Sequence, residues 1–246
     1  MRIYKQLATV LIVLLLTACA ATKQGAVPED TGFLRAPDLL KPGKPGQAEQ
    51  VYFKPGVDWS SYNKVLLDPV TVWRGKESQM TGVTAAQAQH MADYFYQLIH
   101  TALAKDFQMV TSPEPNTLRI KVAIIKLKES DVALETVSTV VPQARLITSL
   151  ASAGSGKPPS FVGQASVQAN VIDAESNELL SEGSDARVGG QSLSSVSINS
   201  WTDVENIMAF WVARTTYNLC KARKGTDCVA PVSYTHLTLP TTLNSW

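Results

Sequence analysis

The sequence has no excess of charge of either sign and, beyond its first residues, no long hydrophobic run. Lysine and arginine number 22 and aspartate and glutamate 21 among 246 residues, so the formal net charge is +1. A nucleic-acid-binding domain usually carries a basic excess, and we therefore expect no nucleic-acid partner. A helix that crosses a membrane needs about 20 predominantly apolar residues, and only the N-terminus comes near that length.

Histidine is scarce, and this limits the chemistry that the sequence predicts. His90 and His100 lie on one predicted helix, where ten residues place them about 280° apart, so they do not face one ligand. The segment 154–157 resembles part of a phosphate-binding loop but lacks its first glycine and its final hydroxyl residue. No Gly-x-Ser-x-Gly motif is present, although a serine–histidine–aspartate triad without that motif stays open. We therefore predict no catalytic residue, no cofactor and no metal site.

The N-terminus has the order of charge, apolar run and cysteine that is typical of a bacterial lipoprotein precursor. Two positive charges precede the apolar run 7–16, which is shorter than a membrane span and fits a signal peptide. The run ends in Leu16-Thr17-Ala18-Cys19, which resembles a lipobox. We predict a signal peptide over residues 1–18, cleavage between Ala18 and Cys19, and acyl chains such as palmitate on Cys19; more than one chain gives stable anchoring. The alternative is a single transmembrane anchor whose cysteine is accidental.

The residue after the predicted lipidated cysteine bears on localisation. Ala20 stands there rather than an aspartate, and by the sorting rule of enteric bacteria this favours the outer membrane over the inner membrane. We expect a lipid-anchored domain that faces the periplasm.

The C-terminal residues read differently from the rest of the chain. Residues 232–242 resemble a translated transposase sequencing adapter and show no helical period. We interpret residues 231–246 as an artefact and leave them out of the fold prediction. The alternative is a genuine polar tail.

Cys220 and Cys228 remain once Cys19 is assigned to lipid. They are eight residues apart (228 − 220 = 8), and Gly225 between them can end a helix and turn the chain. Disulfides persist in the oxidising periplasm, so a disulfide is favoured and free thiols are the alternative. A metal site needs more ligands than this region offers.

Hydrophobic periodicity predicts the secondary structure. Apolar residues recur at helical spacing over residues 84–105 and again over 204–219, and Thr84 with Gln87 resembles a capping box. Strands are predicted at 63–73, where Pro69 indicates an edge or a bulge, and at 108–111, 118–124, 161–173 and 179–188. In the strand 161–173, alternation predicts that one set of side chains points inward (Ala165, Val167, Ala169 and Val171) and the other outward (Gln164, Ser166, Gln168 and Asn170). A short helix is predicted at 144–150.

These elements predict an α+β fold made of a single two-layer domain, with a mainly antiparallel sheet and two long helices packed on one face. The domain is expected to span residues 51–230. Residues 19–50, which are rich in proline, glycine and alanine, are expected to form a lipidated N-terminus and flexible tether in which two apolar islands, 32–34 and 39–40, dock on the domain.

Two sets of residues are candidates for a ligand or partner surface. Asp185 and Arg187 alternate on one strand face with Glu182 nearby; they form either an ion pair across a cleft or an ordinary exposed pair. Trp59, Trp73 and Trp201 lie at the ends of predicted elements and either anchor an interface or cover the ends of the core.

Five short motifs occur in an order that is similar to one uncharacterised family. They are Gly32-Phe33-Leu34, Val57-Asp58-Trp59-Ser60-Ser61-Tyr62, Val140-Val141-Pro142, Ser160-Phe161-Val162-Gly163, and Asp173 with Glu178-Leu179-Leu180. Over residues 30–222 the chain resembles the bacterial lipoprotein family known as domain of unknown function 3313 (DUF3313). The resemblance implies a lipoprotein domain that faces the periplasm, and it implies no activity or catalytic residue.

The expected function is that of a non-catalytic accessory or binding domain of the cell envelope, held at the membrane through the lipid on Cys19. The expected partner is an envelope protein, a lipid or a cell-wall component. The alternatives are a hydrolase acting on an envelope substrate and a structural spacer.

Overall fold

The computed structural model describes residues 22–27, 31–75, 79–129, 162–189 and 201–231. Within these ranges the chain is mixed α/β, with one ten-stranded sheet and two long helices. The strands are β1 Thr22–Gln24, β2 Lys41–Pro42, β3 Gln50–Phe53, β4 Lys64–Leu67, β5 Thr71–Val72, β6 Gln79–Thr81, β7 Gln108–Met109, β8 Thr117–Lys128, β9 Gln164–Asp173 and β10 Leu179–Gly189. The long helices are α2 Ala85–Leu103 and α5 Thr202–Ala222, and two short 3₁₀ turns are η1 Pro37–Leu39 and η2 Trp59–Ser61. The short helix predicted at 144–150 and the motif 140–142 lie outside the described residues.

The sheet is ordered β2-β3-β10-β9-β8-β4-β7, with β1 on β10, and β5 and β6 on β8. Its longest ladders, β8–β9 and β9–β10, are antiparallel, as predicted. The ladders that β4, β5 and β6 form with β8 are parallel and were not predicted. Parallel neighbours need a crossover connection, and α2 lies between these short strands and β8 in the chain.

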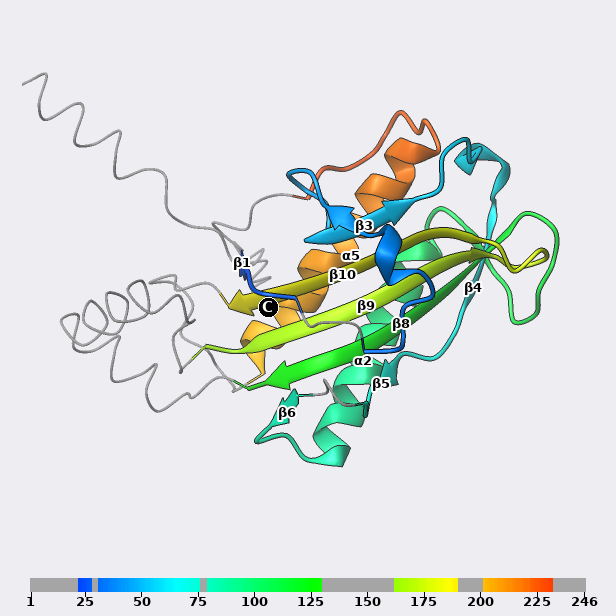
Figure 1. Ribbon diagram of the computed structural model, residues 1–246. Coiled ribbons are helices and arrows are strands. Elements are labelled where there is room, and N and C mark those ends of the chain that lie inside the picture. The colour runs from blue at the N-terminus through cyan, green and yellow to red at the C-terminus, as the bar shows by residue number, and fades with distance from the viewer. Residues whose placement is uncertain (1–21, 28–30, 76–78, 130–161, 190–200, 232–246) are drawn as a thin grey trace, which may run out of the picture.

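Both helices follow the predicted periodicity. Thr84 and Gln87 form the predicted capping box, in which each side chain bonds the other residue's backbone N–H. The buried face of α2 includes Met91 and Phe95, and that of α5 includes Ile207 and Trp211; all four belong to one hydrophobic core with the sheet. Figure 1 shows α2 and α5 passing behind β8, β9 and β10.

The predicted strand 63–73 is broken at Pro69. β4 ends at Leu67, and pairing with β8 resumes in β5 at Thr71. Proline has no N–H to donate to the ladder. The sequence therefore placed the irregularity correctly, although it did not predict that the strand would split.

The flexible tether predicted over residues 19–50 is wrong for the described residues from Thr22 on. β1 pairs with the end of β10, and β2 pairs with β3, which pairs with β10. Between them residues 31–36, which we call the strap, cross the face of β9 and β10. The predicted docking of the island at Phe33 is confirmed, because its ring packs edge-on against Trp73 with centroids 5.6 Å apart.

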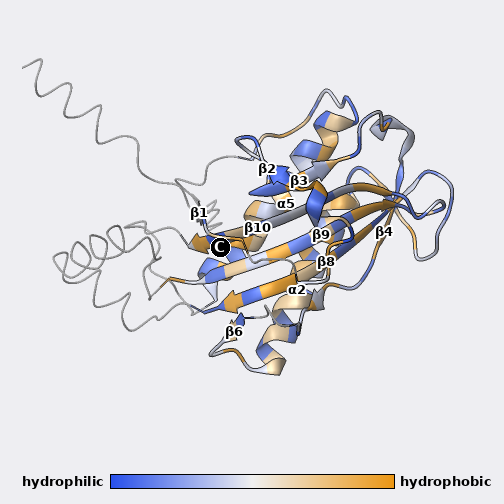
Figure 2. Cartoon of the chain, in the orientation of Figure 1, coloured by the Kyte–Doolittle hydropathy of each residue, from blue (hydrophilic) through white to orange (hydrophobic). Residues whose placement is uncertain are grey.

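The strap explains part of a second departure from prediction. Hydropathy alternates along β8 and β9, as Figure 2 shows, and polar side chains of β9 were expected to face solvent. They are instead buried: Gln164 is 8% exposed, Ser166 1%, Gln168 0% and Asn170 2%. Thr31 Oγ1 contacts Gln168 Oε1 at 2.5 Å, and Asn170 Nδ2 donates to the Phe33 carbonyl. Periodicity reports which residues share a face, and it does not report whether a distant segment covers that face.

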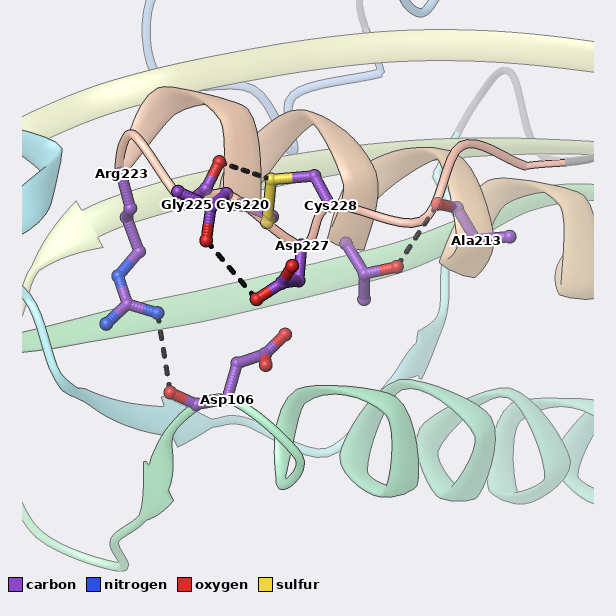
Figure 3. The surroundings of a disulfide bond; sticks show 9 residues. Asp106, Ala213, Cys220, Arg223, Gly225, Asp227 and Cys228 are labelled. Atoms are coloured by element: carbon purple, nitrogen blue, oxygen red, sulfur yellow. Dashed lines mark hydrogen bonds between the residues drawn. A yellow bond between two sulfur atoms is a disulfide. The ribbon is translucent and has the colours of Figure 1, made fainter.

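The end of α5 is closed by a disulfide. Cys220 in the last turn and Cys228 beyond it are bonded, with Cα atoms 5.6 Å apart. Gly225 lies against both sulfurs, and a Cβ there would meet Cys220 Sγ at 2.7 Å. Figure 3 shows this turn and Arg223, which reaches from the same helix end to the backbone carbonyl of Asp106, just beyond α2.

Candidate functional site

An apolar cavity of about 260 Å³ lies between α5, α2 and the sheet. Its walls are mostly aliphatic and aromatic side chains, among them Phe95, Ile99, Ile120, Val122, Val167 and Leu219. Small residues create the space. Ala169 and Gly183 are direct partners on β9 and β10, so this stretch of sheet carries little side-chain volume opposite α5. Because packed protein interiors leave few voids, a cavity of this size is a candidate binding site.

The cavity has a polar end and an open end. At one end Asp185 and Trp211 are both buried. Toward the other, Trp59 and Phe53 line it, and Phe53 keeps 46% of its surface exposed. A large apolar side chain that remains half exposed at a cavity mouth is the kind of surface that contacts an apolar ligand.

Asp185 is the centre of a buried network. Its Oδ2 accepts hydrogen bonds from Trp211 Nε1 at 2.6 Å and from Arg187 Nε at 2.9 Å. Its Oδ1 accepts from the Glu49 backbone N–H at 2.9 Å and from Gln24 Nε2 at 3.2 Å. Four donors satisfy a carboxylate, so this group joins β1, the start of β3, β10 and α5 and has no acceptor capacity left for a ligand.

The predicted pair of Asp185 and Arg187 is therefore real but not exposed. Asp185 is 3% exposed, and the Arg187 side chain 10%. Arg187 also lies over the ring of Phe210, 4.0 Å from its centroid. Glu182, which the sequence placed nearby, faces the opposite side of the sheet, where it accepts hydrogen bonds from the strap. Residues 182 and 185 differ by an odd number of positions, and strand geometry separates them.

A second acid lies beside this network. Burial raises the pKa of Glu49, and the nearby Asp185 carboxylate raises it further, while Arg187 opposes the rise. The Oε2 atom of Glu49 is buried, and no group in the described part of the chain forms a hydrogen bond with it. Sequence reasoning missed this residue because Glu49 lies in the segment that was interpreted as a tether.

The structure does not bring the three candidate tryptophans together. Trp59 lines the cavity. Trp73 lies beside the strap, where its Nε1 donates to the Thr31 carbonyl at 2.9 Å. Trp201 precedes α5 and packs at the edge of the core. Ala18 and Cys19 lie outside the described residues.

The described residues contain neither a cluster of metal ligands nor a helix suited to cross a membrane. There, no three side chains of histidine, cysteine, aspartate or glutamate gather as metal ligands would. Neither α2 nor α5 has the length and apolarity that a membrane crossing requires. His90 is exposed on α2, and His100 contacts the ring of Tyr96 with centroids 6.0 Å apart.

The fold and the cavity define a mixed α/β domain with a small apolar pocket between helices and sheet. The chain belongs to the family described as protein of unknown function DUF3313, whose model matches residues 29–215. This confirms the family resemblance. No curated protein matches the chain.

Solved structures give only distant likenesses. The PelC dodecamer from Paraburkholderia phytofirmans has 9% identity and a TM-score of 0.36, over 72% of this chain and 97% of that one. A protein from Xanthomonas campestris described as DUF330 has 8% identity and a TM-score of 0.39, over 71% of this chain and 93% of that one. Likenesses of this degree support no conclusion on function.

Proposed function

We propose that this chain is a lipid-anchored, non-catalytic binding domain of the cell envelope, and that its ligand is an apolar molecule held in the cavity beneath α5. The observation that carries the proposal is the cavity itself, which is walled by apolar side chains from β8, β9, α2 and α5. In this proposal the two helices form one layer, the sheet forms the other, and the ligand lies between them.

The chemistry of the lining supports an apolar ligand. Removal of apolar surface from water contributes about 25 cal/mol per Å², and the polar network at the closed end is already satisfied internally by four donors to Asp185. A polar ligand in the same place would leave its own groups without partners, which costs free energy. Lipid on Cys19 would hold the domain at an outer membrane, facing the periplasm, where apolar molecules of the envelope are within reach.

Titration with the fluorescent apolar dye Nile red tests this function. The full chain carrying Cys19→Ser is purified without detergent, because detergent would compete for the cavity. Saturable fluorescence enhancement is expected, and Ala169→Phe, which places a ring in the cavity, should abolish it. Glu175→Phe on the exposed β9–β10 turn adds the same ring outside the cavity and should bind dye as the parent does.

A second cavity-filling variant controls for misfolding of the Ala169→Phe variant. Thr215→Trp acts from the exposed surface of α5, so the core packing is left intact and circular dichroism should be unchanged. Dye binding to the N-terminal apolar run would be equal in all variants. Equal binding by the parent, Ala169→Phe and Thr215→Trp, all folded, would contradict the proposal.

A further inference from the structure

We infer that the cavity binds one acyl chain whose anionic head group is held by Arg214. The inference rests on the proposed function and specifies its ligand as a single-chain amphiphile with a carboxylate or phosphate head. Two observations support it: Arg214 lies at the rim of the cavity, and its Nε has no hydrogen-bond acceptor in the described part of the chain.

Arg214 lies on α5 beside residues that line the cavity. Its guanidinium is close to Gly46, where an added Cβ would meet Arg214 Nη1 at 2.7 Å. Asn218, one helical turn further on, lines the cavity and donates from Nδ2 to the Gly46 carbonyl at 3.3 Å. Gln47, the residue after Gly46, also lines the cavity. The guanidinium, close to Gly46, therefore lies beside Gln47 and Asn218 at the rim of the cavity.

Arg214 has neither a hydrogen bond nor an ion pair with any residue in the described part of the chain, and its Nε is buried without an acceptor. Its one described interaction is with the ring of Phe210, 5.6 Å from the centroid. Arg187 contacts the same ring but is paired with Asp185. A partly desolvated guanidinium without an acceptor is costly, and an anion with two oxygens matches its forked donors.

The two acidic residues near this rim, Asp185 and Glu49, do not exclude an anionic head group. Asp185 is compensated by Arg187 and by three further donors. Burial and the nearby Asp185 carboxylate both raise the pKa of Glu49. The local charge therefore favours an anionic head group over a cationic one.

The shape of the cavity favours a linear tail. The α5 residues that line it run from Trp211 to Ala222, which is roughly 16 Å along a helix axis. Aliphatic and aromatic side chains line this path, so each methylene of a tail that enters it is removed from water. A chain whose head group lies at Arg214 would place its tail under α5.

Displacement of Nile red by three amphiphiles with the same tail tests the inference. The full chain carrying Cys19→Ser is titrated with dodecanoate, dodecyl phosphate and dodecanol at pH 8. We expect at least one anionic amphiphile to displace the dye at a concentration about tenfold lower than dodecanol, because a charge-assisted hydrogen bond is worth a factor of this size. The tighter of the two anions shows whether the head group resembles a fatty acid or a phospholipid.

Arg214→Gln should remove the preference for the anions and leave displacement by dodecanol unchanged. Lys221→Gln removes an exposed charge from the same helix and should keep the preference. Equal displacement by all three amphiphiles in the parent would overturn the role of Arg214 while leaving the cavity as a binding site. Failure of all three, together with failure of the dye to bind, would overturn the proposed function as well.

Discussion

Trp211 Nε1 donates to Asp185 Oδ2 across 2.6 Å, and this bond joins the middle of α5 to β10, an interior strand of the sheet. Both residues are buried, at 8% and 3% exposure. The indole ring also packs against Phe95 of α2, with centroids 6.0 Å apart. One side chain therefore connects both helices to the network of β1, β3 and β10, and the closed end of the cavity depends on it.

Replacement of Trp211 should destabilise the fold through this bond. Trp211→Phe keeps an aromatic ring but removes the donor, and the buried Asp185 side chain then has one hydrogen-bond donor fewer. We expect a loss of about 1–3 kcal/mol in the free energy of unfolding, measured by urea denaturation. Trp59→Phe serves as the matched control, because Trp59 is only partly buried and none of the described hydrogen bonds involves its indole. Equal losses in the two variants would show that ring volume, rather than the bond to Asp185, is what matters.

The strap should depend on Glu182. This carboxylate is 1% exposed and accepts the Arg35 N–H at 2.6 Å through Oε2 and the Ala36 N–H at 3.1 Å through Oε1. Glu182→Gln places an amide N–H₂ opposite one backbone N–H, so one of the two bonds is lost. We expect faster hydrogen exchange at Arg35 and Ala36, and an unfolding free energy lower by about 1–3 kcal/mol.

Glu178→Gln is the control for the strap. Glu178 lies four residues before Glu182, is exposed, and forms a surface ion pair with Lys54, and such pairs contribute little. Exchange at Arg35 and Ala36 should not change in this variant. If Glu182→Gln leaves those amides as protected as in the parent, the strap is held by Phe33, Trp73 and Thr31 without help from the carboxylate.

The parts of this fold that the sequence predicted are those set by local pattern. The stripe of α2, its capping box at Thr84, and the alternation of β8 and β9 all depend on residues close in the chain. Strands of two or three residues, such as β1 and β5, are too short for a periodic signal. The burial of Gln168 and Asn170 depends on a segment more than 130 residues earlier in the chain.

The candidate site was harder to predict for the same physical reason. Alternation predicts that Asp185 and Arg187 share one strand face, but their burial depends on Trp211 and on the backbone of Glu49. The cavity results from the strand register that sets Ala169 opposite Gly183. Small residues in a strand give no sign of a cavity until that register is known.

The disulfide should contribute to stability, and the glycine at position 225 should matter more while the disulfide is intact. In the loop-closure model, a bond across eight residues is worth about 2.5 kcal/mol, and Cys220→Ser with Cys228→Ser should lower the unfolding free energy by up to that amount. Gly225→Ala puts a methyl group 2.7 Å from Cys220 Sγ and should destabilise the oxidised chain. In the double-serine background the hydroxyls are smaller, so the same alanine should cost less. An alanine cost that is equal in the two backgrounds would contradict the close packing seen in Figure 3.

The carboxylate of Asp173 should make the stability of the β9–β10 turn decrease as the pH falls in the acid range. Burial acts to raise the pKa of this carboxyl. Hydrogen bonds act in the opposite direction and outweigh burial, so the pKa of Asp173 is lowered. The donors are the Ser176 backbone N–H and hydroxyl, the Tyr62 hydroxyl and the Glu175 backbone N–H. A lowered pKa means that the ionised form stabilises the folded state above the unfolded pKa of about 3.9, and that this stability is lost as the pH falls through the folded value. Asp173→Asn should therefore lower the urea midpoint at pH 7, and its difference from the parent should shrink between about pH 4 and pH 2.

Asp227→Asn, at an exposed site near the end of the described chain, controls for the change in net charge and should leave the midpoint at pH 7 nearly unaltered. A difference between Asp173→Asn and the parent that stays constant from pH 7 to pH 2 would mean that the ionised carboxylate does not hold this turn.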